Sequence, residues 1–257
     1  MTADNPSFSL VGRKALVTGA SRGIGQALAV GLARAGADVA VAARDAGSLT
    51  ATVDAIRASG RTALGLGIDV RDAEAIRGGV ARAADAFGGL EILVNNAGVE
   101  QVCDSLEVDE ALWDRIVDTN LKGAFFCAQA AAHRMAADAG GAIVNVCSLT
   151  SEVGVPTAVP YGSSKSGLLG MTRALAAEWA GKGIRVNAIG PGYFRTELTE
   201  VFYQDEAWQQ AMLAKIPLRR FGRLEDLVGA TVFLCSDAAA YVTGQCLYID
   251  GGYMASI

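Results

Sequence analysis

The chain has 257 residues, of which 51% are hydrophobic and 19% charged, and its formal net charge is −5. This length predicts one domain spanning residues 1–257, and the acidic balance argues against a nucleic-acid-binding surface. The first residues lack a basic-then-apolar targeting pattern, and no later stretch is apolar enough to cross a bilayer. We therefore expect a cytoplasmic protein with no membrane partner.

Short apolar runs rich in β-branched residues alternate with longer helical patterns, which is typical of βαβ units in a parallel sheet. The predicted strands are Ala15–Thr18, Val39–Ala42, Ala63–Ile68, Ile92–Val94, Ala142–Cys147, Arg185–Ile189 and Gln245–Ile249. The predicted helices are Gly25–Ala35, Ala46–Ser59, Ala73–Phe87, a long region around Leu112–Ala139, Gly162–Ala180 and Glu225–Ser236. These elements predict a single doubly wound (Rossmann) seven-stranded parallel sheet with helices on both faces.

A glycine turn, Thr18–Gly25, joins the first predicted strand to the first helix. Glycines allow a tight turn and a close approach of the backbone, and a helix N-terminus attracts a pyrophosphate. A plain connecting turn would have the same composition, but its place at the first βα junction favours a dinucleotide. The candidate cofactor contacts in this turn are Gly19, Ser21, Arg22, Gly23, Ile24 and Gly25.

The end of the second predicted strand bears on which dinucleotide is bound. Many dinucleotide sites place a carboxylate there to accept the ribose hydroxyls, whereas this chain has Ala43 followed by Arg44. Guanidinium groups from Arg44 and Arg22 would pair with a 2′-phosphate. The sequence therefore predicts a preference for NADP(H), with NAD(H) possible, unless both arginines are ordinary solvated charges.

Four polar residues near the later strand ends are candidates for catalysis. Tyr161 and Lys165 are four residues apart on a predicted helix and so share a face. Ser148 follows the fifth predicted strand, and Asn120 is predicted to open a helix before it. Together with the glycine turn and the Asn95–Gly98 segment (NNAG), this set resembles the short-chain dehydrogenase/reductase family. The likeness covers essentially the whole chain.

The resemblance implies roles for these residues. Tyr161 would be the general acid/base, Lys165 would lower the pKa of Tyr161 and hold the nicotinamide ribose, Ser148 would bind the substrate oxygen, and Asn120 would order a water relay. The other implied cofactor contacts are Asp69, Val70, Asn96, Gly98, Pro191, Gly192, Phe194 and Thr196. The sequence departs from the family pattern at Cys147, where serine is frequent, and at Phe194, where a smaller aliphatic residue is frequent.

A segment rich in aromatic residues, Gly192–Phe221, follows the sixth predicted strand. We expect it to be a substrate lid, although a helical pair packed on the core or on a partner subunit would have the same pattern. The family also implies a homotetramer that assembles through the helix Leu224–Ser236 and the strand Gln245–Gly252.

The sequence argues against a metal site and a disulfide framework. The five cysteines, at positions 103, 127, 147, 235 and 246, never form a C-x-x-C pair, so we expect reduced thiols. The single histidine, His133, lies in an alanine-rich helical stretch, which leaves a Ser-His-Asp hydrolase without a base.

The sequence thus predicts an NADP(H)-dependent oxidoreductase that acts on a small ketone or secondary alcohol. Residues 216–222 and the tail from Tyr248 resemble gluconate 5-dehydrogenase-like sugar, sugar-acid and polyol dehydrogenases. One alternative is a 3-oxoacyl-thioester (acyl carrier protein) reductase, whose acidic carrier would dock on Arg219, Arg220 and Arg223. A non-catalytic dinucleotide-binding regulator is the other alternative.

Overall fold

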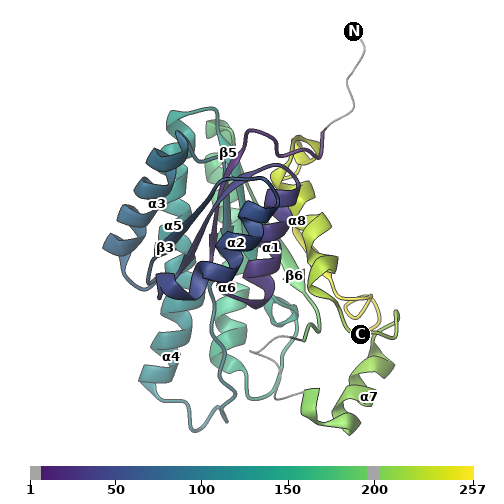
Figure 1. Ribbon diagram of the computed structural model, residues 1–257. Coiled ribbons are helices and arrows are strands. Elements are labelled where there is room, and N and C mark those ends of the chain that lie inside the picture. Colours follow the sequence, from purple (N-terminus) through teal and green to yellow (C-terminus); the bar gives the residue numbers. More distant parts are fainter. Residues whose placement is uncertain (1–6, 196–202) are drawn as a thin grey trace.

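A computed structural model describes residues 7–195 and 203–257, and its centre is one parallel sheet (Figure 1). The strand order is β3-β2-β1-β4-β5-β6-β7, and each neighbouring pair is parallel. The strands are β1 (Lys14–Thr18), β2 (Asp38–Ala43), β3 (Ala63–Gly67), β4 (Ile92–Asn95), β5 (Gly141–Val146), β6 (Ile184–Pro191) and β7 (Cys246–Ile249). The predicted doubly wound, seven-stranded sheet is confirmed.

Helices cover both faces of the sheet because its central strands are apolar on both sides (Figure 1). The helices are α1 (Gly23–Arg34), α2 (Thr50–Ala58), α3 (Ala73–Phe87), α4 (Glu110–Val117), α5 (Gly123–Ala137), α6 (Val159–Trp179), α7 (Glu206–Lys215) and α8 (Val228–Cys235). One core packs α1, α2 and α8 against the sheet, and a second core packs α3, α5 and α6 against the opposite face.

The long region predicted around Leu112–Ala139 is two α-helices joined by a π-helical segment, Asp118–Lys122. Asn120 lies inside this segment, so the prediction that Asn120 opens a helix was wrong. The backbone N–H of Gly123 donates to the carbonyl of Asp118, and a Cβ at Gly123 would lie 2.5 Å from the Val70 carbonyl oxygen. The close approach of the loop after β3 thus accompanies a local widening of the helix, a feature frequent at functional sites.

The carboxyl ends of the strands share one edge of the sheet, since all strands are parallel. The strand order reverses between β1 and β4, and a crevice opens at such a switch point. Thr18, Asn95 and Val146 end β1, β4 and β5 at this edge. Segments distant in sequence therefore meet where a ligand can bind.

Candidate active site

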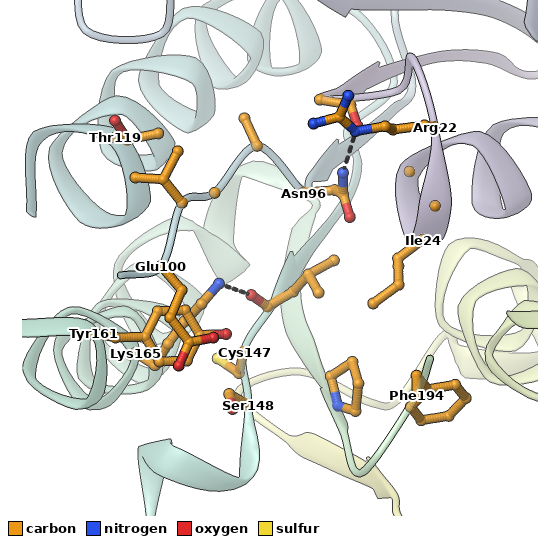
Figure 2. Close-up of a pocket in the computed structure, with 18 of the residues that line it drawn as sticks. Arg22, Ile24, Asn96, Glu100, Thr119, Cys147, Ser148, Tyr161, Lys165 and Phe194 are labelled. Carbon is orange, nitrogen blue, oxygen red and sulfur yellow. Dashed lines mark hydrogen bonds between the residues drawn. The ribbon is translucent and has the colours of Figure 1, made fainter. Parts of the chain in front are cut away.

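A cavity of about 930 Å³ runs along the carboxyl edge of the sheet (Figure 2). Most of the predicted site residues line it: Gly19, Ser21, Arg22, Gly23, Ile24, Gly25, Arg44, Asp69, Val70, Asn96, Gly98, Ser148, Tyr161, Lys165, Pro191, Gly192 and Phe194. Asn120 does not line it, and Thr196 lies outside the described residues. The fold thus gathers candidates from the whole chain into one continuous space.

The glycine turn is fastened to the end of β4. The side-chain amide of Asn96 donates to the carbonyl oxygens of Thr18 and Gly19, at 3.0 and 2.9 Å. A Cβ at Gly25 would lie 2.3 Å from both the Asn96 amide nitrogen and the Gly19 carbonyl oxygen. Only glycine fits at position 25. Because no side chain stands there, the N-terminus of α1 can lie at the floor of the cavity. Such a turn suits a pyrophosphate, which supports the predicted dinucleotide.

Charged groups surround the far end of the cavity, next to this turn. Arg71 donates to both carboxylate oxygens of Asp69, and its Nη2 lies 2.6 Å from Oδ2. This hydrogen bond, together with Arg44 nearby, lowers the pKa of Asp69. Arg22 and Arg44 are exposed on the same wall. Arg71 was not predicted from the sequence, because an arginine near an acidic residue is too common a pattern to indicate a site.

At the other end of the cavity, Tyr161, Lys165 and Ser148 converge (Figure 2). The buried Lys165 donates from Nζ to the Val146 carbonyl oxygen at 2.6 Å, and this Nζ lies 5.6 Å from the centroid of the Tyr161 ring. Burial lowers the pKa of Lys165. A hydrogen bond joins the side chains of Tyr161 and Ser148. The predicted phenol, ammonium and hydroxyl thus share one surface.

Lys165 was expected to lower the pKa of Tyr161, but this pKa is raised. Burial raises this pKa, the negative charge of Glu100 raises it further, and the hydrogen bond with Ser148 acts in the opposite direction. The physical reason is that a phenolate in this apolar corner loses water and faces a carboxylate. The groups of the chain itself therefore favour the protonated phenol.

Asn120 lies behind the wall of the cavity. Its side-chain oxygen accepts from the Val99 N–H at 2.8 Å, and its amide nitrogen donates to the Val99 carbonyl at 2.9 Å and to Ser164 Oγ at 3.1 Å. Ser164 Oγ in turn donates to the Tyr161 carbonyl at 2.7 Å. Asn120 therefore connects the loop after β4 to the helix that carries Tyr161. Ser164, which was not predicted from the sequence, completes this connection.

Aromatic side chains from the Gly192–Phe221 segment close the cavity beside Tyr161. Tyr193, Phe194, Tyr203 and Trp208 all line it. The ring of Trp208 contacts those of Tyr193 and Tyr203, with centroids 5.8 and 5.3 Å apart. Trp208 belongs to α7, which projects from the body of the domain (Figure 1). The substrate lid expected from the sequence stays a prediction, since residues 196–202 lie outside the described residues.

The three arginines considered for carrier docking have partners within the chain. Arg220 and Arg223 both pair with Asp226, at 2.6 and 3.6 Å, and the Arg220 hydrogen bond lowers the pKa of Asp226 to about 2. Arg219 donates to the carbonyl oxygens of Leu213 and Ala214. Asp226 therefore offsets part of the positive charge of these arginines, and Arg219 binds the last turn of α7.

A family model described as Enoyl-(Acyl carrier protein) reductase matches residues 19–254. The gluconate 5-dehydrogenase of Gluconobacter oxydans is 42% identical over 97% of this chain and 98% of its own length. A 3-oxoacyl-acyl-carrier-protein reductase of Staphylococcus aureus is 41% identical over 93% of this chain and 97% of its own.

Proteins similar to this chain are also found among solved structures. One, described as a short-chain alcohol dehydrogenase from Sinorhizobium meliloti, is 66% identical with a TM-score of 0.96, covering 98% of this chain and 100% of its own. A gluconate 5-dehydrogenase from Burkholderia cenocepacia, in complex with NADP and tartrate, is 36% identical with a TM-score of 0.94, covering 97% of this chain and 98% of its own.

Proposed function

The chain belongs to the short-chain dehydrogenase/reductase family, and we propose that it is an NADP(H)-dependent oxidoreductase for a sugar-type secondary alcohol or its ketone. The convergence of Tyr161, Lys165 and Ser148 at one end of a cavity whose other end is a glycine turn carries this proposal. A small-molecule carbonyl or alcohol is the partner that such a cavity takes.

NADP(H) fits the cavity. The backbone of Gly19–Gly25 would hold the pyrophosphate, and the exposed guanidinium groups of Arg22 and Arg44 would pair with the 2′-phosphate. Lys165 would bind the nicotinamide ribose. When bound, the cofactor supplies or accepts the hydride. Relatives solved with NADP support the same choice.

The proton chemistry belongs to Tyr161. In reduction, its hydroxyl donates a proton to the alkoxide that develops on the substrate, and Ser148 holds the substrate oxygen. In oxidation, the phenolate removes the hydroxyl proton. Lys165 places a positive charge near the phenol ring, and Asn120 positions the helix that carries it.

Among possible substrates, we favour sugar acids and polyols over acyl thioesters. The gluconate 5-dehydrogenases among the relatives support this choice. The internal pairing of Arg220 and Arg223 with Asp226 weighs against the carrier-protein alternative. The presence of the whole catalytic set weighs against the non-catalytic regulator.

The assembly and the cellular location are further parts of the proposal. Among the described residues, no helix is both long and apolar enough to span a bilayer. We propose a cytoplasmic homotetramer, with the edge strand β7 and helix α8 at a subunit interface. The side chain of Leu247 on β7 is 42% exposed, which suits such an interface.

Absorbance of NADPH, followed against a panel of sugar acids, polyols, simple ketones and acetoacetyl thioesters, tests the function. We expect turnover of polyhydroxy substrates and none of the thioesters. Tyr161→Phe should lower kcat by about 10²- to 10⁴-fold with little change in NADPH affinity. Equal rates for wild type and Tyr161→Phe would show that Tyr161 is not the acid/base.

A further inference from the structure

Glu100 is a charged residue in the cavity for which the catalytic scheme has no use. It follows the Asn95–Gly98 segment, lines the cavity together with Tyr161 and Lys165 (Figure 2), and its carboxylate acts electrostatically on both. The side chain is half-buried, and this burial raises its pKa, while Lys165 lowers it. Within residues 7–195 and 203–257, no hydrogen bond reaches its carboxylate.

A partly buried carboxylate needs a hydrogen-bond donor, which solvent in the cavity or a bound ligand with a hydroxyl group would supply. Among the described residues, the neighbours of this carboxylate make no hydrogen bond to it: Lys165 Nζ directs one N–H to the Val146 carbonyl, and Tyr161 is hydrogen-bonded to Ser148. The Cys147 thiol also faces Lys165 and Tyr161. The carboxylate of Glu100 is therefore an open acceptor beside the reacting centre.

The position of Glu100 limits what it can contact. Tyr161 must reach the oxygen on the reacting carbon of the substrate. The carboxylate of Glu100, near Tyr161, can then reach a group on the carbon next to the reacting one. An ionised carboxylate only accepts hydrogen bonds, and it accepts them more strongly than a neutral group does. It also repels a second carboxylate.

We propose that Glu100 determines substrate specificity: its carboxylate accepts a hydrogen bond from a hydroxyl on the carbon next to the reacting one and excludes a carboxylate from that carbon. This proposal rests on the proposed oxidoreductase function and deepens it. Vicinal diols are then preferred over simple secondary alcohols, and 2-hydroxy acids are rejected. A sugar acid reacts only at a carbon remote from its carboxylate.

The test measures kcat/KM with NADP⁺ for 2,3-butanediol, 2-butanol and lactate. Glu100→Ala should lower the ratio of diol to 2-butanol by about tenfold or more, because a charged hydrogen bond is lost. Glu100→Gln keeps a neutral acceptor, so its ratio should fall less, while its kcat/KM for lactate should rise. Glu107→Gln removes the same charge from an exposed site on the same loop, outside the cavity. It should change neither the ratio of diol to 2-butanol nor the kcat/KM for lactate.

The pH profile gives a second readout. Removing the charge of Glu100 removes one cause of the raised Tyr161 pKa, so the rising limb of oxidation should move to lower pH in Glu100→Gln and stay in place in Glu107→Gln. NADPH affinity, measured by fluorescence titration, should be unchanged in all variants, which shows an intact fold and cofactor site.

The outcomes separate the two proposals. If wild type turns over nothing in the panel of sugars, ketones and alcohols, the proposed function fails. If it turns over polyhydroxy substrates but does not oxidise 2,3-butanediol faster than 2-butanol, the role of Glu100 is overturned. A diol preference and pH profile that persist unchanged in Glu100→Ala and Glu100→Gln overturn it as well.

Discussion

Arg44 and Tyr161 are two single residues on which the proposed chemistry of this cavity depends. Ala43 ends β2 where a carboxylate would favour ribose hydroxyls, and Arg44 follows it, so the proposed site would attract a 2′-phosphate. In the proposed reaction Tyr161 carries the proton, and the groups around Tyr161 shift the pH range in which it can do so. Replacing either residue should therefore change a property that can be measured.

The direction of the Tyr161 pKa shift predicts a pH dependence. Reduction needs the protonated phenol, which is present below the pKa, so a raised pKa should keep reduction active through neutral pH and slow it only in alkali. Oxidation needs the phenolate, so its rate should rise with pH. A positively charged nicotinamide would lower the pKa and move this rise to lower pH. Rates in both directions across pH 6–10, about the range that most enzymes tolerate, check the signs. Oxidation that is fastest in acid would contradict them.

Replacing Arg44 should change cofactor choice. In Arg44→Asp, the new carboxylate repels a 2′-phosphate and accepts ribose hydroxyls, so the NADP/NAD ratio of kcat/KM should fall by about tenfold or more. The control, Arg82→Asp, makes the same charge change on the exposed face of α3, outside the cavity. A ratio that changes equally in both variants would assign the effect to overall charge.

At the scale of elements, glycines allow the βα junctions to approach one another. The turn from Gly19 to Gly25 contacts Asn96 so closely that no side chain fits at Gly25. The π-helical segment between α4 and α5 has a similar cause, because Gly123 packs on the backbone at Val70. Close packing of backbones thus builds the floor of the cavity.

Gly25→Ala should therefore weaken both cofactor binding and the fold. Its Cβ would lie 2.3 Å from Gly19 O and Asn96 Nδ2, which must move apart. We expect a loss of about 1–3 kcal/mol in the free energy of unfolding and weaker NADPH binding. Gly78→Ala in α3 meets nothing within 4 Å and should stabilise the protein by about 0.5–1 kcal/mol. Urea unfolding and NADPH titration distinguish the two; equal effects would refute the packing argument.

At the scale of the whole molecule, β7 ends the sheet with apolar side chains only partly covered. An edge strand with an exposed leucine favours association with another chain. In helix α8, Val232 and Phe233 are also only half-buried. The proposed tetramer would cover this region.

Leu247→Arg should split the tetramer, because four buried arginines would lack partners in a symmetric interface. We expect tetrameric mass for wild type by light scattering and a smaller species for the variant. Leu106→Arg places the same charge at a 91% exposed leucine on the loop before α4 and should stay tetrameric. A monomeric wild type would rule out the proposed assembly.

The sequence by itself predicted the sheet, most helices and a set of site residues nearly all of which line the cavity. These depend on local patterns: alternation of apolar runs, a glycine turn, and Tyr161 and Lys165 on one helical face. The exact helix ends and the π-helical segment at Asn120 could not be predicted from the sequence, since they arise from packing against segments distant in the chain.

Only the tertiary structure decided what depends on neighbours far apart in sequence. In the folded chain Glu100 lies near Tyr161, and the pKa of Tyr161, which Lys165 was expected to lower, is raised. The tertiary structure also engaged the amide of Asn120 behind the cavity wall and paired Arg220 with Asp226. The physical reason is that burial and charge act over a few ångströms in space, whereas a sequence pattern reports only separation along the chain.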